Sequence, residues 1–257
     1  MAEYISVEQA RGMSGLRVVL TPGGPAPWSE AIKGILHVKR LPYVRVAQEA
    51  PGANRALLEW TAQTAAPVVI WNDERPRSIW NDQLYLVERL APEPALIPGA
   101  IEDRALMFGY CNELCGETGL AWSRRLIMVA AMASSSSEGG RKFGKYLGDK
   151  YGFDPHAAQR APARVAEILG FLSARLERQR SLGSRFFIGD RLSALDIYWA
   201  AFATLIQPLP QELCPMAPGL RRAQTVSDPE ILRALNPALL EHRDFIYHEY
   251  LELPLDF

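Results

Sequence analysis

The sequence has little net charge and no long apolar run. Its formal net charge is −1 over 257 residues, so it lacks the cationic excess that drives binding to phosphate backbones and anionic membranes. We therefore expect neither a nucleic-acid partner nor a membrane partner. Uninterrupted apolar runs stay below the roughly 18 residues of a membrane span, and residues 1–15 lack the apolar core of a secretory signal. These absences predict a cytoplasmic protein.

Cysteine is scarce, and its placement favours neither a disulfide framework nor a metal site. The three cysteines, Cys111, Cys115 and Cys214, are an odd number in a long chain, which argues against a disulfide framework. Cys111 and Cys115 are spaced i, i+4 on a predicted helix, but no histidine or third cysteine stands at ligand spacing. We therefore expect reduced, buried thiols and no metal.

The first third of the chain contains a regular alternation of strand and helix patterns. After a polar N-terminal tail at residues 1–15, β-rich runs alternate with apolar residues at helical spacing. This order, βαβαββα, predicts an α/β domain over residues 16–91. The predicted elements are strand 16–20, helix 27–39, strand 43–47, helix 54–62, strand 66–71, strand 77–80 and helix 82–91.

The rest of the chain reads as helical. Prolines mark a linker at residues 92–99, because proline breaks helices and stiffens an extended chain. From residue 100 to residue 257 the apolar spacing is almost wholly helical. Ser193 and Asp196 have the spacing of a capping box, which predicts that a buried helix begins there. The sequence thus predicts an all-α second domain over residues 100–257.

Three stretches, in this order and spacing, resemble the cytosolic glutathione S-transferase superfamily. They are AAPVV (65–69), IWNDQLYLVERLA (79–91) and FIGDRLSALDIYWAAF (187–202). The resemblance covers nearly the whole chain after residue 15. It implies a thioredoxin-like N-terminal domain, an all-helical C-terminal domain, glutathione as co-substrate, and a homodimer formed chiefly through the first domain.

The resemblance assigns glutathione contacts to four residues of the first domain. In the family, a cis-proline turns the main chain of the next residue toward the cysteinyl backbone of glutathione, and these residues are Pro67 and Val68 here. An ordinary trans-proline at the start of an edge strand is the alternative. Asp82 and Gln83 stand at a helix N-terminus suited to the γ-glutamyl group, although Gln83 departs from the family's usual hydroxyl. Asp82 acting only as a helix N-cap is the alternative.

The segment GGPAPWSE (23–30) carries an alanine where serine, tyrosine and cysteine members of the family have a hydroxyl or a thiol. By the resemblance, Ala26, Pro27 and Trp28 form part of the glutathione site, yet alanine offers no donor to a thiolate. The dipole and free N–H groups of a helix beginning near Pro27 remain. Ser29 and Thr21 are the nearest hydroxyls that would replace the donor, and helix capping is the alternative role for Ser29.

The resemblance implies two candidate functions. The first is a glutathione transferase-like enzyme that adds the glutathione thiolate to an apolar electrophile. The electrophile pocket would draw on Trp28, Tyr110, Leu114 and Phe257. The second is a non-catalytic protein of the same fold that binds glutathione or a hydrophobic ligand, and Ala26 is the residue that favours it.

Overall fold

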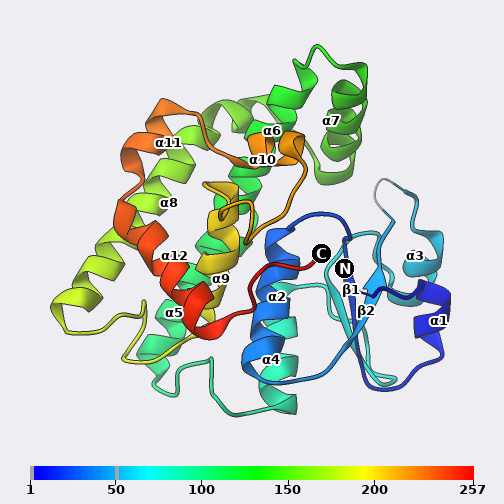
Figure 1. Cartoon of the computed structure of the whole chain (residues 1–257), viewed down its shortest axis with the longest axis horizontal. Helices are drawn as coiled ribbons and strands as arrows, with labels where there is room; N and C mark the ends of the chain where they lie inside the picture. The colour runs from blue at the N-terminus through cyan, green and yellow to red at the C-terminus, as the bar shows by residue number, and fades with distance from the viewer. Residues whose placement is uncertain (1–2, 50–51) are drawn as a thin grey trace.

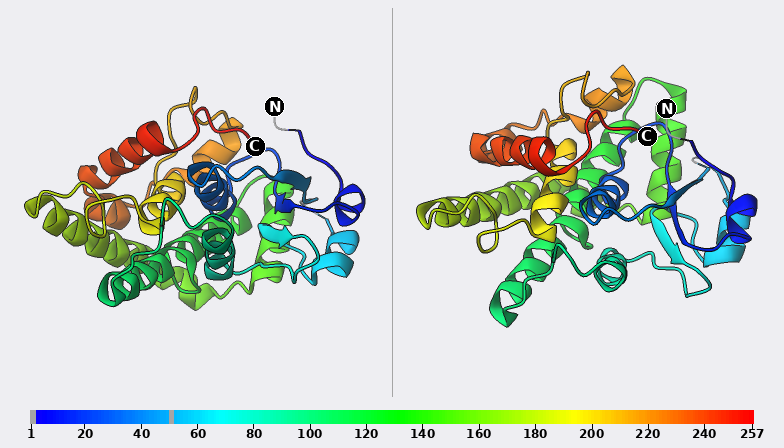
Figure 2. Two further views of the ribbon diagram at one scale, coloured as in Figure 1. Left: turned by 90° about the horizontal axis from the view of Figure 1, so that it is seen from below. Right: turned by 60° about the horizontal axis from the view of Figure 1, so that its bottom comes forward.

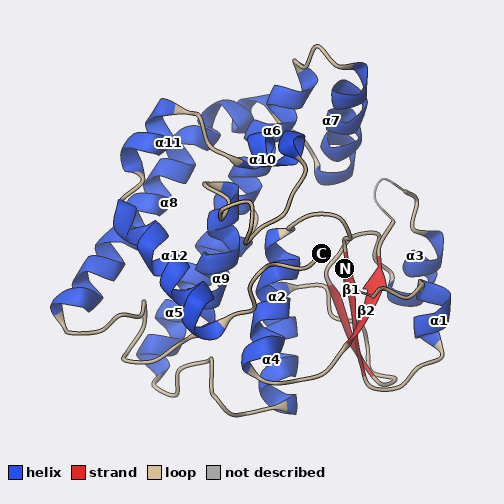
Figure 3. Ribbon diagram, in the orientation of Figure 1, coloured by secondary structure: helices blue, strands red, loops and turns tan. Residues whose placement is uncertain are grey.

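The computed structural model describes residues 3–49 and 52–257. Figure 1 shows a small sheet with its helices at one side of the molecule and a larger helical body beside it. Figure 3 shows that the strands are confined to the first part. The predicted fold class is therefore confirmed: a thioredoxin-like α/β region is followed by an all-α region.

Three strands form the sheet in the described part of the chain, in the order β2-β1-β3. β1 (Leu16–Leu20) runs parallel to β2 (Val44–Ala47) and antiparallel to β3 (Val68–Trp71). Helix α2 (Pro27–Val38) connects the parallel pair, because parallel neighbours need a crossover connection. Every residue of β1 is buried, which shows that both faces of the sheet are covered.

Alternate residues of β1 serve the two faces of the sheet, as the pleat requires. Val18 joins the core beneath α2 and α4 (Trp80–Leu90). Val19 packs in a separate cluster with residues of α1 (Val7–Arg11) and α3 (Arg55–Thr61). The sheet is thus the middle layer between two pairs of helices.

Residues 1–15 are more structured than the expected polar tail, although residues 1 and 2 lie outside the described part. Helix α1 begins after Ser6, which forms a capping box with Gln9. Ile5 forms an isolated parallel bridge with Val46. The segment is ordered because it adds main-chain hydrogen bonds along the free edge of β2, a long-range contact that local composition does not reveal.

The predicted strand at residues 77–80 is wrong. Arg77 forms only an isolated bridge with Val69, and Trp80 is already the first residue of α4. Pro76 has no N–H to extend the pairing. The observed region therefore has three strands rather than the four of the βαβαββα prediction, within the residues that the structure describes.

The helical region follows a loop at residues 92–99, where a linker was predicted. The longest helix is α8, of 27 residues. The elements are α5 (Ile101–Cys115), α6 (Leu120–Ala133), α7 (Glu138–Tyr151), α8 (Pro155–Ser181), α9 (Ala194–Phe202), η1 (Ala203–Leu205), α10 (Pro218–Gln224), α11 (Pro229–Ala234) and α12 (Pro237–Tyr250).

Helix α9 is the centre of the helical region and its main link to the sheet region. All of its residues are buried, and α2 and α9 lie side by side in both views of Figure 2. Gly34 of α2 permits this approach, because a Cβ there would lie 3.1 Å from both Ile197 and Leu251. The predicted capping box is confirmed: Asp196 Oδ2 accepts a hydrogen bond from the main-chain N–H of Ser193 at 2.9 Å.

Two further properties of the structure concern membrane-spanning helices and clusters of possible metal ligands. Within residues 3–49 and 52–257, no helix combines the length and apolar character needed to cross a bilayer. Across the same residues, His, Cys, Asp and Glu side chains form no group of three or more that would hold a metal ion. Cys111, Cys115 and Cys214 are free and buried, and burial raises the pKa of each thiol, that of Cys214 to about 11.

Candidate functional site

The turn between β1 and α2 presents the N-terminus of α2 without a side-chain cap. Ala26 is the N-cap residue and Pro27 the first residue of the helix. Neither offers a side-chain acceptor to the first-turn N–H groups, which have no partners inside a helix. The positive end of the helix dipole is therefore open at Ala26, in an arrangement that favours an anion.

Residues from the far end of the chain hold this turn in place. Gln224 Nε2 donates a hydrogen bond to the carbonyl of Pro25 at 3.1 Å. Gly24 lies so close to α10 that an added Cβ would be 2.6 Å from Leu220 Cδ2. A larger residue at position 24 would therefore require the side chain of Leu220 to move.

The peptide bond between Ala66 and Pro67 is cis, as the resemblance implies. The role expected for Val68 needs correction. Val69 exchanges two main-chain hydrogen bonds of 2.9 Å with Arg77, and successive residues of a strand direct these groups to opposite sides. The main chain of Val68 therefore faces β1, inside the sheet.

Ala66 has the free main-chain groups beside Pro67 that were expected at Val68. It precedes β3, and its side chain is only partly buried. No hydrogen bond within the described residues uses its N–H or its C=O. A peptide-like ligand that pairs with the cis-proline loop would therefore pair with Ala66.

The carbonyl of Thr64, three residues before Pro67, accepts hydrogen bonds from side chains of three segments. Gln48 Nε2 lies 2.9 Å away at the end of β2, Lys150 Nζ lies 2.8 Å away on α7, and Asn54 Nδ2 lies 3.4 Å away before α3. Sequence reasoning missed all three residues. The positions of the two amides at the ends of predicted elements were the only available signal.

Asp82 lies in the first turn of α4. This helix begins at Trp80, two residues earlier than predicted, so Ile79 is the N-cap residue and Asp82 is not. The carboxylate of Asp82 is 32% exposed and pairs with Arg75 at 3.2 Å. Its position near a helix N-terminus and its exposure leave it open to a ligand cation, with Arg75 as a competing partner.

Gln83, the neighbour of Asp82, is used inside the protein. It is buried, and its Nε2 donates to the carbonyl of Pro67 at 3.0 Å and to the carbonyl of Arg77 at 3.1 Å. These bonds join the first turn of α4 to the cis-proline loop. Gln83 therefore supports the shape of the site, and its amide nitrogen is not offered to a ligand.

The two hydroxyls proposed to replace the missing donor differ in their surroundings. Thr21 Oγ1 donates to Gln48 Oε1 at 2.7 Å, so its proton is already engaged. Ser29 is 2% exposed, and its Oγ is shielded from solvent with no hydrogen-bond partner in the described residues. It is not a helix cap, since the N-cap position is Ala26. Neither hydroxyl presents a free proton to the surface beside Ala26.

Trp28 is half-buried in the first turn of α2, where it joins the sheet region to the helical region. Its Nε1 donates to the carbonyl of Cys115 at 3.2 Å, and its ring meets Phe202 edge to face at 5.1 Å. The guanidinium of Arg125 lies over its ring at 5.1 Å. Burial lowers the pKa of Arg125, and Tyr151 opposes that effect.

The structure does not assemble the electrophile pocket that the sequence suggested. Tyr110 stacks on Phe171 with ring centroids 4.2 Å apart, in a groove of about 540 Å³ between α5 and α8. Leu114 is fully buried in the core, so it offers no surface to a ligand. Phe257 lies beneath Lys33, 5.7 Å from its Nζ. Of the four expected residues, Trp28 alone lies in the turn at the N-terminus of α2.

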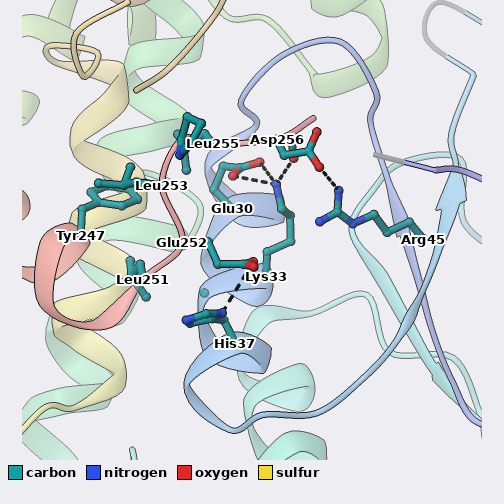
Figure 4. Close-up of a pocket in the computed structure, with 12 residues that line it drawn as sticks. Glu30, Lys33, His37, Arg45, Tyr247, Leu251, Glu252, Leu253, Leu255 and Asp256 are labelled. Carbon is teal, nitrogen blue, oxygen red and sulfur yellow. Dashed lines mark hydrogen bonds and ion pairs between the residues drawn. The ribbon is translucent and has the colours of Figure 1, made fainter. Parts of the chain in front are cut away.

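A polar pocket, separate from the turn at Ala26, lies where the C-terminal segment crosses α2, as Figure 4 shows. Lys33 Nζ bonds both oxygens of Glu30, at 3.1 and 3.0 Å, and the carbonyl of Asp256 at 2.6 Å. Arg45 pairs with the Asp256 carboxylate at 3.0 Å. Burial raises the pKa of Glu30, and this effect exceeds the lowering by Lys33. These contacts fasten the C-terminal segment to α2 and β2.

The chain has the glutathione S-transferase fold. It resembles a glutathione S-transferase from Methylobacillus flagellatus KT solved with GSH bound, with 14% identity, a TM-score of 0.62, and coverage of 91% of this chain and 95% of that one. It also resembles one from Methylobacterium radiotolerans JCM 2831 in complex with glutathione sulfonate, with 14% identity, a TM-score of 0.59, and coverage of 92% of each chain.

A third similar structure is the β-etherase LigF from Sphingobium sp. strain SYK-6. It has 18% identity and a TM-score of 0.57, and the match covers 85% of this chain and 98% of that one. No protein-family model and no curated protein matches the sequence. At these identities the similarity establishes the fold, and the site must be argued from the residues themselves.

Proposed function

We propose that the chain is a glutathione transferase-like enzyme that adds the thiolate of glutathione to an apolar electrophile. The observation that carries the proposal is the convergence of three features: the uncapped end of α2, the cis-proline loop and the first turn of α4. Gln83 joins α4 to that loop, and Gln48 joins Thr21 before α2 to Thr64 in the loop. Similar structures have been solved with glutathione or a glutathione derivative.

Each feature suits one part of glutathione. In this proposal Asp82 binds the ammonium of the γ-glutamyl group, and Ala66 pairs its main chain with the cysteinyl residue. The N-terminus of α2 faces the sulfur. The proposal includes two domains, at residues 16–91 and 100–257, which residues 92–99 join. It also places the protein in the cytoplasm.

The N-terminus of α2 is the main source of thiolate stabilisation in this proposal. The thiol of free glutathione, like that of cysteine, has a pKa of about 8.5. Lowering a pKa by one unit requires about 1.36 kcal/mol of preferential stabilisation of the thiolate. A helix N-terminus contributes about 0.3–2 kcal/mol toward a nearby anion. Because Ser29 is shielded and Thr21 is engaged, neither of these two hydroxyls adds to that amount.

We expect the substitution Ala26→Ser to lower the pKa of bound glutathione by about half to one unit, because one neutral hydrogen bond contributes about 0.5–1.5 kcal/mol. Turnover near neutral pH should rise with it. The matched variant Ser29→Ala should leave the pKa nearly unchanged. The ultraviolet absorbance of the bound thiolate, followed against pH in the three proteins, measures these shifts.

Calorimetry of glutathione binding and a conjugation assay with an aromatic electrophile complete the test. Binding without turnover, with all three proteins titrating like free glutathione, would make the chain a non-catalytic binding protein, the candidate that Ala26 favours. A rise in the thiol pKa on Ser29→Ala would show that Ser29 rotates to meet the ligand. Absence of glutathione binding would refute the transferase and leave, of the second candidate, only a protein that binds a hydrophobic ligand.

We also propose that the chain forms a homodimer through the outer surface of α4 and α5. Ile79, Tyr85 and Leu106 are 58%, 51% and 43% exposed, and Tyr85 stacks on Phe108 across the two helices at 5.3 Å. Clustered exposed apolar side chains of this kind mark interaction surfaces. Because α4 belongs to the first domain, an interface that includes α4 agrees with the expected dimer formed chiefly through that domain.

We expect the charge introduced by Tyr85→Asp to shift the dimer toward monomer at micromolar concentration, because a carboxylate at the centre of an apolar interface loses its hydration. Leu182→Asp is the matched control, since Leu182 is 73% exposed at the C-terminal end of α8 and belongs to neither α4 nor α5. Sedimentation velocity measures both. A wild-type protein that is monomeric under these conditions would contradict the proposal.

A further inference from the structure

Arg125 of α6 is enclosed by aromatic rings from three helices. Its guanidinium carbon lies 4.0 Å from the ring centroid of Tyr151, 5.0 Å from that of Trp122 and 5.1 Å from that of Trp28. The side chain is half-buried. No carboxylate in the described part of the chain pairs with it, and it makes no hydrogen bond there. The guanidinium thus has five N–H donors and no acceptor among the described residues.

A second cation lies beside it. Lys150 Nζ is 5.5 Å from the centroid of the Tyr151 ring that Arg125 also faces. Its hydrogen bonds go to two neutral oxygens, the carbonyl of Thr64 and the hydroxyl of Tyr146, and it has no ion pair among the described residues. Two cations therefore lie within 5.5 Å of the centroid of the Tyr151 ring, and neither pairs with a carboxylate among the described residues. Such a pair attracts a negatively charged ligand.

These cations flank the proposed glutathione site. Trp28, against which Arg125 packs, is two residues after Ala26. Thr64, to which Lys150 binds, is three residues before Pro67. The positive end of α2, at Ala26 and Pro27, directly precedes Trp28 in the chain and adds to the same field. An anion held by Arg125 would thus lie next to the sulfur of bound glutathione.

We propose that Arg125, with Trp28, Trp122 and Tyr151, binds the carboxylate of a planar aromatic second substrate, so that this enzyme prefers aryl acids to neutral electrophiles. The inference rests on the proposed function. A half-buried guanidinium gains most from a bidentate carboxylate partner, and the surrounding rings offer stacking surface to an aryl group. The guanidinium stays charged, so the preference does not depend on pH near neutrality.

The matched probes are 4-chloro-3-nitrobenzoate and its methyl ester, which share the ring, the chlorine and the nitro group and differ in that the ester methyl replaces the negative charge. In both, the glutathione thiolate forms a carbon–sulfur bond at the ring carbon that bears chlorine. The carbon–chlorine bond breaks and chloride leaves with the bonding electron pair, while the thiol proton goes to solvent. Quenching of tryptophan fluorescence, to which Trp28 and Trp122 beside Arg125 contribute among six tryptophans, gives a binding measurement that needs neither glutathione nor turnover.

We expect the wild-type protein to bind the acid about tenfold more tightly than the ester, and Arg125→Met to abolish this difference by weakening acid binding. In turnover, the KM for the acid should rise by a similar factor in the variant while the KM for the ester stays within about twofold. Arg125→Lys keeps the charge without the planar fork and should retain part of the preference. Arg185→Met is the control, since Arg185 covers Phe245 at 3.6 Å on another part of the helical region.

Several results would overturn the inference. Equal binding of acid and ester by the wild-type protein refutes it, and this result needs no variant. If Arg125→Met weakens glutathione binding while the acid preference persists, the guanidinium serves a glutathione carboxylate. Equal losses for acid and ester would show that Arg125 only holds the helices together. The proposed function fails separately, if acid binds but glutathione does not displace chloride from either probe.

Discussion

Replacing Asp196 with alanine should lower the free energy of unfolding by about 3–5 kcal/mol, the largest effect that we expect from one substitution in the helical region. Asp196 is fully buried. Its carboxylate accepts hydrogen bonds from the N–H of Phe187 at 3.0 Å and from the N–H and hydroxyl of Ser193 at 2.9 and 2.8 Å. His242 Nε2 lies 3.0 Å away. Alanine would leave all of these buried polar groups unpaired.

Urea denaturation at one protein concentration measures this loss as a shift of the midpoint. Asp228→Ala is the matched control, because Asp228 caps α11 at a partly exposed position and bonds two N–H groups, at 2.9 and 3.3 Å. Its loss should cost about 1 kcal/mol, as for other N-caps. Similar midpoints for the two variants would show that Asp196 acts as an ordinary cap and not as a hub.

The second large effect is expected for Lys33→Met. The side chains of Lys33 and Glu30 are only 9% and 5% exposed, and Lys33 holds both carboxylate oxygens. Removing one partner of a buried ion pair costs about 3–5 kcal/mol, because the remaining charge is left uncompensated. The variant also removes the hydrogen bond from Lys33 Nζ to the carbonyl of Asp256. The C-terminal segment should therefore become more susceptible to proteolysis.

This loss should depend on pH. Burial already raises the pKa of Glu30, and Lys33 is the main group that opposes this. Without Lys33, the folded chain binds the Glu30 proton more tightly than the unfolded chain does, so stability falls as pH rises above the unfolded value. The difference between variant and wild type should be small near about pH 4, below the ordinary pKa of about 4.3, and grow toward neutrality.

The double variant Glu30→Gln/Lys33→Met separates loss of the pair from loss of packing. It removes the uncompensated charge, so it should recover much of the stability lost in Lys33→Met. Lys145→Met is the surface control, because Lys145 and Asp149 are paired at 2.7 Å but 76% and 66% exposed. Exposed pairs contribute about 0–1 kcal/mol. A Lys33→Met loss no larger than this would contradict our account of the buried pair.

The features that sequence reasoning predicted well have local signals. Ser193 and Asp196 mark the start of α9 because a capping box is written in four consecutive residues. The resemblance was enough to indicate the cis peptide at Pro67. The same kind of box at Ser6 and Gln9 is also a local signal, but the order of that segment further depends on the pairing of Ile5 along the edge of β2, which no local pattern indicates.

The errors concern directions that tertiary packing decides. Whether Val68 or Ala66 has free main-chain groups depends on the bridge of Val69 with Arg77, which no local pattern indicates. Helical spacing puts Tyr110 and Leu114 on one face of α5, but the rotation of that face is set by its neighbours. One residue therefore lines a groove and the other fills the core.

The cluster around Arg125 illustrates the limit of sequence reasoning most directly. Its rings come from α2, α6 and α7, and Lys150 reaches a loop 86 positions earlier in the chain. No periodicity relates such residues. Composition alone shows no cationic excess, yet the folded chain gathers two cations at one place, because net charge says nothing about how charge is distributed.

The turn that presents Ala26 is held by residues that are synthesised much later than the turn itself. Gln224 follows Pro25 by 199 residues, and Leu220, which confines Gly24, is nearly as far along the chain. A ribosome that adds about 5–20 residues per second needs roughly 10–40 s to cover that interval. During synthesis, a nascent chain that has formed the sheet has the residues of this turn but lacks the partners that fix it. The open end of α2 is therefore completed only when the last third of the protein has been made.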